Sequence, residues 1–155
     1  MHSKIKNTLL EQLIFESKAQ EIQKLIVGAV IKLEGKFLLL ERQSSDFMGG
    51  LVELPSGAVD SGEDLLTALA REIQEETGLF VKSVNVYLGS FDYLSGSGKK
   101  SRQFNFLVET EPGEISLSPN EHCAYHLISL TDKNFIKLNI SEATKTVLLA
   151  AEKIV

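Results

Sequence analysis

Hydrophobic positions along the chain follow two periods, one typical of strands and one typical of helices. An apolar run rich in β-branched residues fills 25–33 and a second apolar run fills 37–40, on either side of a Glu-Gly turn, which predicts a β-hairpin. Apolar and polar positions alternate over 80–91, which predicts one long strand or two short ones, and the apolar run over 104–108 predicts another strand. The Gly- and Ser-rich residues between these last two segments predict a flexible hairpin tip.

Good helix formers are concentrated before the second pair of strands. Leu66, Leu69 and Ile73 recur at three- and four-residue steps, which predicts a helix with one buried stripe. Polar residues precede the stripe, and Gly78 follows it as a C-terminal stop. We therefore expect a helix over 61–76.

Two more helices are expected towards the ends of the chain. An irregular apolar stripe predicts an N-terminal helix within residues 1–24, and a last helix is expected over 141–151, capped by its first residue. Residues 121–130 lead into a strand, after which Thr131 or Asp132 is placed to cap a short helix. The whole chain has 155 residues, which is enough for one α/β domain with its own core.

Composition and charge narrow the class of protein. The net charge is −5 and the sequence pI is near 5.3, which argues against binding to duplex nucleic acid. One cysteine cannot form an internal disulfide, and the N-terminus lacks the features of a signal peptide. No apolar run approaches the ~20 residues that span a bilayer. We therefore expect a soluble, cytoplasmic protein that does not enter a membrane.

Three acidic side chains are crowded on one face of the predicted 61–76 helix. Glu72, Glu75 and Glu76 stand at i, i+3 and i+4, where like charges repel one another. A solvated acidic face is one interpretation of this cluster. The other is a site for Mg²⁺, which takes oxygen ligands and joins carboxylates to the phosphates of a substrate.

The spacing of residues 57–79, GAVDSGEDLLTALAREIQEETGL, favours the metal site. The positions that carry this spacing are Gly57, Glu63, Arg71, Glu72, Ile73, Glu75, Glu76, Gly78 and Leu79. At every one of these positions the segment resembles the Nudix box, the motif of the Nudix hydrolase family. The resemblance implies a single Nudix domain over 1–155, with a mixed β-sheet in an α/β/α sandwich and the N-terminal helix as an addition.

The resemblance also implies a set of metal ligands and a catalytic group. Glu72, Glu75 and Glu76 would hold Mg²⁺, or Mn²⁺ in its place, together with the backbone carbonyl of Ser56. Many members of the family have a glycine where this chain has Ser56, but a serine still supplies a carbonyl. Glu121 matches the position of a catalytic glutamate in MutT-like members, and there it would take a proton from water. In some members a glutamate of the box has this role instead.

Other residues of the box are implied to support the site. Arg71 would pair with a carboxylate of the box and fix its position, and Glu63 would hydrogen-bond the loop. A plain helix-surface salt bridge between Arg71 and Glu75 is an alternative interpretation. Gly57 and Gly78 would shape the loops at the two ends of the box.

Two residues outside the box are candidates for substrate binding. Arg42 lies where basic residues of MutT-like members face phosphates, although a surface arginine at the end of a strand fits the residue type equally well. Asn139 resembles an asparagine that contacts the base. His122, Cys123 and His126 look superficially like a zinc cluster, but three ligands on one short strand are not expected to face one ion.

The resemblance implies Mg²⁺-dependent hydrolysis of a nucleoside diphosphate linked to another moiety. A MutT-like nucleoside triphosphate pyrophosphohydrolase, which gives a nucleoside monophosphate and pyrophosphate, fits the chain length and the position of Glu121. The alternatives are hydrolysis of nucleotide sugars, ADP-ribose or dinucleoside polyphosphates and, in another class, a non-catalytic nucleotide sensor. Many relatives form dimers, so a homodimer that uses the N-terminal helix also stays open.

Overall fold

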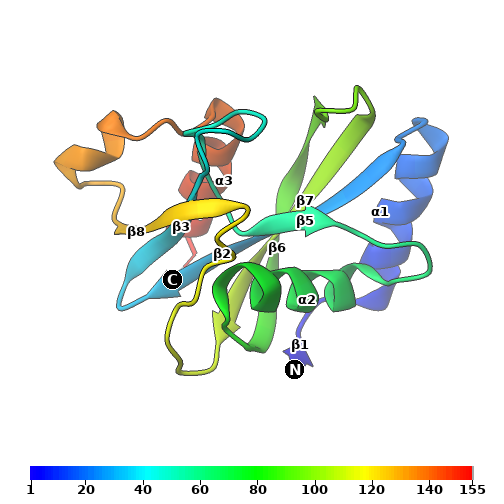
Figure 1. Cartoon of the computed structure of the whole chain (residues 1–155). Coiled ribbons are helices and arrows are strands. Elements are labelled where there is room, and N and C mark those ends of the chain that lie inside the picture. The colour runs from blue at the N-terminus through cyan, green and yellow to red at the C-terminus, as the bar shows by residue number, and fades with distance from the viewer. Residues whose placement is uncertain (155) are drawn as a thin grey trace.

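Strand β2 lies at the centre of the fold, in contact with strands on both of its edges (Figure 1). The computed structural model describes residues 1–154. The helices are α1 (Asn7–Ala19), α2 (Leu65–Thr77), the 3₁₀ helix η1 (Lys133–Lys137) and α3 (Glu142–Glu152). The strands are β1 (His2–Ser3), β2 (Lys24–Leu33), β3 (Lys36–Arg42), β4 (Val52–Glu53), β5 (Ser56–Ala58), β6 (Val81–Leu94), β7 (Lys100–Thr110) and β8 (His122–Ile128).

The sheet is mixed and divides along one edge of β2. Its main order is β1-β6-β7-β2-β3-β4, in which β2 and β7 are parallel and β2 and β3 antiparallel. The first half of β2 pairs with β5 on the edge where its last residues pair with β3. Strand β8 pairs with β3 and extends this second half of the sheet. The sheet therefore opens between β5 and the β3–β8 pair, and the site described below lies in this opening.

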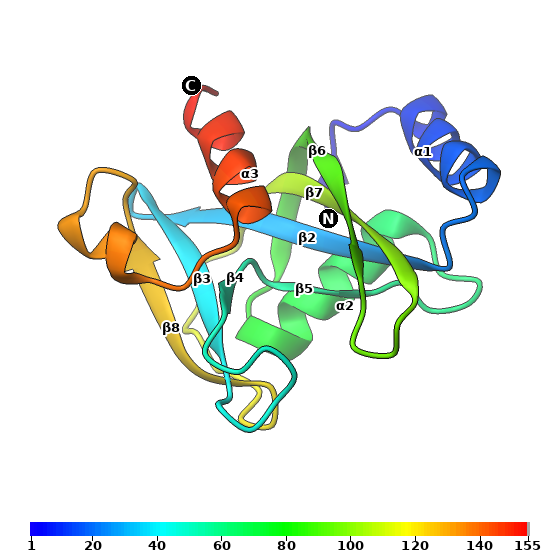
Figure 2. The same ribbon diagram turned by 90° about the horizontal axis from the view of Figure 1, so that it is seen from above.

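Alternate residues of β2 and β3 pack into two separate cores. Val27, Ala29 and Ile31 of β2 face the core that includes α2 and Leu13 of α1. Val30 faces the opposite core, which includes α3. Figure 2 shows α2 and α3 on the two sides of β2. Because successive residues of a strand point to opposite faces, one apolar strand fills both cores. This arrangement confirms the predicted mixed sheet between helices.

The predicted hairpin is formed by β2 and β3 across a two-residue turn. Glu34 and Gly35 have φ values of 52° and 78°, the left-handed pair that a tight hairpin turn requires. The strands predicted over 80–91 and 104–108 are also present, as β6 and β7, and both are longer than the apolar pattern indicated. Residues 95–99 form the hairpin tip between them.

Helix α2 begins four residues later than predicted. Asp64 is its N-cap and accepts a hydrogen bond from the Thr67 N–H at 2.8 Å. Gly62 has a φ of 79°, so residues 61–63 form a turn before the helix. At the other end, Gly78 adopts the left-handed conformation and its N–H donates to the carbonyl of Gln74, as expected for a helix stop.

The two terminal helices also differ from their predicted bounds. Helix α1 occupies only Asn7–Ala19 of the predicted 1–24, because the residues before it form β1, parallel to β6, and Lys24 already belongs to β2. Asp132 caps η1 through the Asn134 N–H at 2.9 Å. Helix α3 is capped by Ser141, as predicted.

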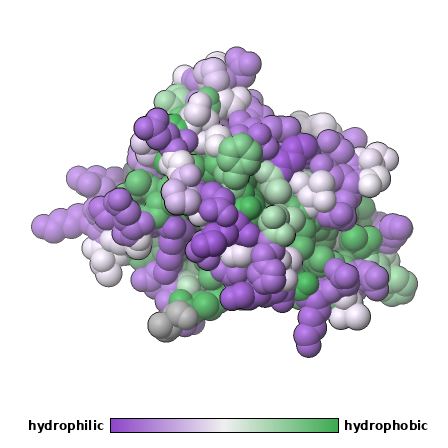
Figure 3. All heavy atoms as spheres, turned by 90° about the horizontal axis from the view of Figure 1, so that it is seen from below, coloured by the Kyte–Doolittle hydropathy of each residue, from purple (hydrophilic) through white to green (hydrophobic). Residues whose placement is uncertain are grey.

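The surface shown in Figure 3 is mostly hydrophilic, with smaller hydrophobic patches between the polar side chains. Within residues 1–154, no helix is long and apolar enough to cross a membrane.

Candidate active site

A cavity of about 200 Å³ lies in the opening between β5 and the β3–β8 pair. Ser56 and Gly57 of β5 line it on one side. Glu121, just before β8, and His122, the first residue of β8, line it on another. Glu76, in the last turn of α2, also contributes to the lining. Three segments that are far apart in the sequence therefore converge on one polar cavity.

Arg71 joins α2, the helix within the 57–79 box, to the loop that precedes it. Its Nε and Nη2 donate to the two oxygens of Glu63, each at 2.8 Å, and Nη2 also donates to the carbonyl of Ala58 at 2.9 Å. Its Nη1 donates to Glu72 at 2.8 Å and to Glu75 at 3.2 Å. The guanidinium therefore holds both the loop and the carboxylates of α2 in place, as only a planar fork with five N–H groups can.

Glu63 completes this connection on the loop side. Its Oε1 accepts a hydrogen bond from the Asp60 N–H at 3.0 Å. The hydrogen bonds from Arg71 and Asp60 lower the pKa of Glu63 to about 2.

Gly57 provides the space for the carboxylate of Glu72. A Cβ atom at Gly57 would overlap the Cδ and both Oε atoms of Glu72, so no larger residue fits here without displacing it. The carboxylate lies against the backbone of β5 and is largely buried, and this burial raises its pKa. Close packing against Glu72 is therefore the reason for a glycine at the start of the box. Backbone conformation is not the reason, since the φ of Gly57 lies outside the left-handed range.

Glu76 is the most deeply buried of the three α2 carboxylates, with only 4 % of its surface exposed. Its Oε1 accepts a hydrogen bond from the Ser56 N–H at 2.7 Å, which ties the end of α2 to β5. Burial, together with the nearby carboxylates of Glu121, Glu53 and Glu72, raises the pKa of Glu76 to about 9. Such a carboxylate is poorly compensated by the protein alone, and a divalent cation would stabilise its charged form.

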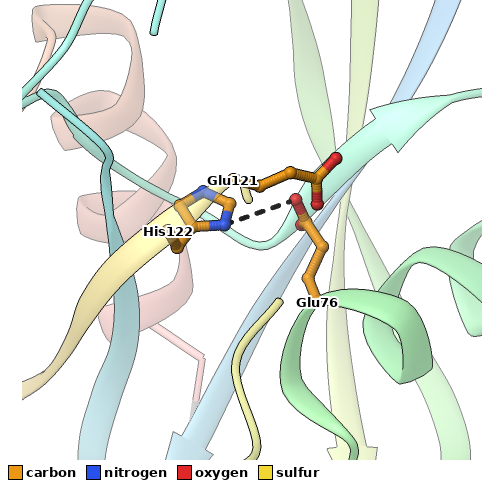
Figure 4. Close-up of side chains that lie close together, drawn as sticks. All are labelled: Glu76, Glu121 and His122. Atoms are coloured by element: carbon orange, nitrogen blue, oxygen red, sulfur yellow. Dashed lines mark ion pairs between the residues drawn. The ribbon is translucent and has the colours of Figure 1, made fainter. Parts of the chain in front are cut away.

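His122 faces the same carboxylate from β8. Its Nδ1 lies 3.7 Å from Glu76 Oε2, and its side chain is almost fully buried. Among residues 1–154, no group forms a hydrogen bond with this Nδ1. Figure 4 shows Glu76, Glu121 and His122 directed toward one another. One ligand atom from each lies within 4.8 Å of the others.

These donors fit a divalent metal ion. Carboxylate oxygens suit Mg²⁺ and Mn²⁺, and an imidazole nitrogen is also acceptable to Mn²⁺ and other transition metals. Glu76 Oε2 is not used by the Ser56 hydrogen bond and is the oxygen closest to His122. Within the described residues, Glu76, Glu121 and His122 are thus the side chains whose atoms lie close enough together to hold an ion.

The other two box glutamates are placed differently. Glu72 lies beneath Gly57 and is paired with Arg71, and the side chain of Glu75 is 55 % exposed at the outer side of Arg71. Neither lines the cavity. The cluster that appeared uniform in the sequence thus contains two largely buried carboxylates, Glu72 and Glu76, and one exposed carboxylate, Glu75.

Arg42 lines the cavity, but its guanidinium is already hydrogen-bonded to a carboxylate. Its Nε and Nη2 donate to the two oxygens of Glu53 at 2.9 and 3.1 Å. Glu53 Oε2 also lies 2.9 Å from Nε2 of His122. Glu53 thus connects Arg42 to His122, although no motif in the sequence singled it out. Its only sequence signal is a charged residue in an apolar stretch before the box.

Asn139 and the remaining zinc candidates lie elsewhere. Asn139 is exposed, its carbonyl accepts a hydrogen bond from the Val52 N–H, and it lines neither this cavity nor the one described next. Cys123 Sγ and His126 Nε2 both lie beside Glu41, away from His122. The structure therefore keeps His122 apart from Cys123 and His126. This agrees with the expectation that the three do not face one ion.

A second cavity of about 260 Å³ adjoins the first and has a different character. The two cavities share Arg42, Glu53, Ser56 and Tyr93. The second is lined mainly by apolar side chains, among them the aromatic rings of Phe47 and Phe91. A polar compartment that suits a metal therefore opens beside an apolar one that suits a flat ring.

Comparison with known proteins places this chain in a family. The family model for the NUDIX domain matches residues 23–147. An ADP-ribose pyrophosphatase from Methanocaldococcus jannaschii is 43% identical over 56 residues, which are 36% of this chain and 32% of that protein. The chain thus aligns with about a third of the length of this curated relative.

Two solved structures have the same fold. The crystal structure of a MutT NUDIX hydrolase from Burkholderia pseudomallei matches with a TM-score of 0.70 and 27% identity, over 85% of this chain and 98% of that one. An Ap4A hydrolase from C. elegans, solved as a binary complex, matches with a TM-score of 0.66 and 28% identity, over 83% of this chain and 95% of that one. Because the family model covers most of the chain and includes the complete box helix, this chain belongs to the Nudix hydrolase family.

Proposed function

We propose that this chain is a Mg²⁺-dependent pyrophosphohydrolase that converts a nucleoside triphosphate into a nucleoside monophosphate and pyrophosphate. The observation that carries the proposal is the pair of adjoining cavities, one lined by Glu76 and Glu121 and the other by aromatic rings. The polar cavity would receive the phosphates, and the apolar one the base. Mn²⁺ would replace Mg²⁺ in the same site.

Several residues in and beside the polar cavity have proposed roles. Glu76 and the Ser56 carbonyl would hold the metal ion, and Glu72 and Glu75 would join them when a cation draws them away from Arg71. When bound, Mg²⁺ neutralises the charge of the phosphates and polarises the phosphoryl oxygens. Glu121, at the exposed rim, would accept the proton of the attacking water. The water oxygen forms a bond to one phosphorus of the diphosphate, the phosphoanhydride bond at that phosphorus breaks, and the leaving phosphate oxygen keeps the bonding electrons.

The connections around the site support these roles by limiting movement. Arg71 and Glu63 would fix the box helix against the loop, and Gly57 would leave space for Glu72. Arg42 is held by Glu53 at the junction of the two cavities, where it would meet the phosphate chain. Restricting these groups before the substrate binds reduces the reorganisation that the reaction requires.

A second candidate is ADP-ribose, because a partial relative carries that activity in its name. Both reactions place a diphosphate on the metal site and differ only in what is attached to it. Release of phosphorus-containing products should therefore be measured with Mg²⁺ over a panel of ribo- and deoxyribonucleoside triphosphates, ADP-ribose, nucleotide sugars and dinucleoside polyphosphates. We expect a triphosphate to give monophosphate and pyrophosphate. Turnover of ADP-ribose without turnover of any triphosphate would overturn the first choice.

The metal ligands are tested by removing single charges. We expect Glu76→Gln and Glu75→Gln to lose at least about 100-fold in kcat, because charge stabilisation at a reacting phosphate is lost. The matched control is Glu109→Gln, which neutralises an exposed carboxylate paired with Lys82 away from the site. Full metal-dependent turnover in both site variants would show that the ligands are assigned wrongly.

A further inference from the structure

Two amide side chains are buried on the face of β7 that borders the apolar cavity. Gln103 has 6 % of its surface exposed and Asn105 is fully buried. They stand two residues apart and therefore on the same face of the strand, and Gln103 lines the cavity. Burying an amide in an apolar setting costs free energy unless hydrogen bonds within the protein replace those to water.

The orientation of both amides is fixed by the backbone. Asn105 Nδ2 donates to the carbonyls of Gly89 at 3.1 Å and of Gln103 at 3.3 Å. Carbonyls only accept hydrogen bonds, so the NH₂ group of Asn105 has to face them and its Oδ1 has to face the other way. This Oδ1 accepts from Gln103 Nε2 at 2.8 Å. The NH₂ group of Gln103 therefore faces Asn105, and its Oε1 is turned away.

The backbone of β2 at Gly28 packs closely against this pair. A Cβ atom at Gly28 would stand 2.5 Å from Gln103 Nε2 and 2.6 Å from Asn105 Oδ1. The glycine thus lets the Gln103–Asn105 hydrogen bond lie directly on the backbone of β2. The pair is held from two strands, and Gln103 has little freedom to turn its amide over.

The side-chain oxygen of Gln103, Oε1, accepts no hydrogen bond from the described residues and is not enclosed. Within residues 1–154, the enclosed side-chain polar atoms without a partner are Asn85 Oδ1, Thr110 Oγ1 and His122 Nδ1. Gln103 Oε1 is not one of them, and no described donor bonds to it. Gln103 lines the apolar cavity, and because its Nε2 is held by Asn105, we take Oε1 to be the amide atom that meets this space. A fixed hydrogen-bond acceptor therefore stands in the wall of a mainly apolar cavity.

We propose that Gln103, oriented by Asn105, selects nucleotides whose base carries an exocyclic amino group. The inference rests on the proposed function, because that function places the base in the apolar cavity. The rings of Phe91 and Tyr93 line the same cavity and offer flat surfaces to a base. An amino N–H that reaches Gln103 Oε1 satisfies the acceptor when water is displaced.

A base without an amino group fits this acceptor less well. The ring N–H of uracil or thymine lies between two carbonyl oxygens, whose lone pairs would face the same Gln103 oxygen. A base with no donor on that edge would leave the oxygen buried and unpaired, which costs free energy. Gln103 thereby becomes a specificity-determining residue, and Asn105 a positioning residue behind it.

The test compares binding of nucleoside monophosphates, which needs no turnover. Calorimetry would give Kd values for AMP and CMP and for their deamino analogues, purine riboside and 2-pyrimidinone riboside monophosphate. In the unaltered protein, we expect loss of the amino group from the tighter-binding nucleotide to weaken binding by about 10- to 100-fold, the cost of an unpaired buried acceptor. In Gln103→Leu we expect the ratio to fall to within about 3-fold, because the acceptor is gone from both complexes.

Controls keep the outcome independent of folding and of the proposed reaction. Gln12→Leu, on the exposed part of α1, makes the same change away from the cavity and should keep the full ratio. If Gln103→Leu fails to fold, Gln103→Met preserves length without the amide and should give the same fall. Equal affinities for amino and deamino nucleotides in the unaltered protein, or no binding of either, would overturn the inference. If the amino group is selected but no triphosphate is hydrolysed, only the proposed function fails.

Discussion

The imidazole of His122 stands between two carboxylates, with Nε2 2.9 Å from Glu53 and Nδ1 3.7 Å from Glu76. The carboxylate of Glu53 in turn accepts hydrogen bonds from Nε and Nη2 of Arg42. The imidazole therefore links the polar groups at the cavity junction to the buried carboxylate of α2. In metal sites, a carboxylate that holds one nitrogen of a histidine fixes the direction of the other.

Replacing His122 should weaken metal binding. We expect His122→Leu to lower the affinity for Mn²⁺ by about 10- to 100-fold, as loss of such supporting contacts commonly does. Titration with Mn²⁺, followed by electron paramagnetic resonance, measures this directly. His126→Leu is the matched control, because that ring contacts Glu41 outside the cavity and should bind Mn²⁺ normally. Equal affinities in the two variants would exclude a role for His122 at the metal.

The contact between Gly57 and Glu72 makes a second prediction. We expect Gly57→Ala to reduce the free energy of unfolding by about 1–3 kcal/mol, because a methyl group has to displace the buried carboxylate or the strand. Chemical denaturation measures the change. Gly113→Ala adds the same methyl group where it would meet only Leu79, at 3.5 Å, and should change stability by less than about 0.5 kcal/mol. A similar loss in both variants would show that the cause is not the Glu72 contact.

The paired hydrogen bonds between Arg71 and Glu63 predict that the stability of the protein depends on pH. The pKa of Glu63 in the folded protein, about 2, is below the value of an unperturbed glutamate. Its contribution to stability is therefore complete above the unfolded pKa and is lost as the pH falls through about 2. We expect Arg71→Lys to raise the pKa of Glu63 toward its ordinary value, since an ammonium cannot give the paired hydrogen bonds. Carboxyl ¹³C NMR titration measures it.

A second arginine supplies the control for that titration. Arg102 donates to both oxygens of Asp92 and lowers the pKa of that carboxyl. Arg102→Lys should therefore raise the pKa of Asp92 and leave that of Glu63 unchanged. A Glu63 pKa that stays near 2 in Arg71→Lys would assign the shift to the loop backbone.

Local patterns in the sequence were sufficient to predict most elements. The hairpin turn at Glu34 and Gly35 and the helix stop at Gly78 depend on nearest neighbours, so their residue types identify them. The start of α2 was predicted too early, because both Ser61 and Asp64 are able to cap a helix. Which of them does so depends on how the loop packs against Arg71, and no local pattern contains that information.

The sequence by itself determined the spacing of Glu72, Glu75 and Glu76 and the family to which it belongs, because helix periodicity fixes their relative positions. Only the tertiary structure decided which carboxylate is buried and which partner faces it. Strand β8 carries a bulge at Cys123, where Arg42 pairs with His122 and Glu41 with Ala124. A bulge shifts side chains by one residue and so reverses the face on which they lie. It turns His122 toward Glu76, and this reversal depends on pairing between strands that are 80 residues apart.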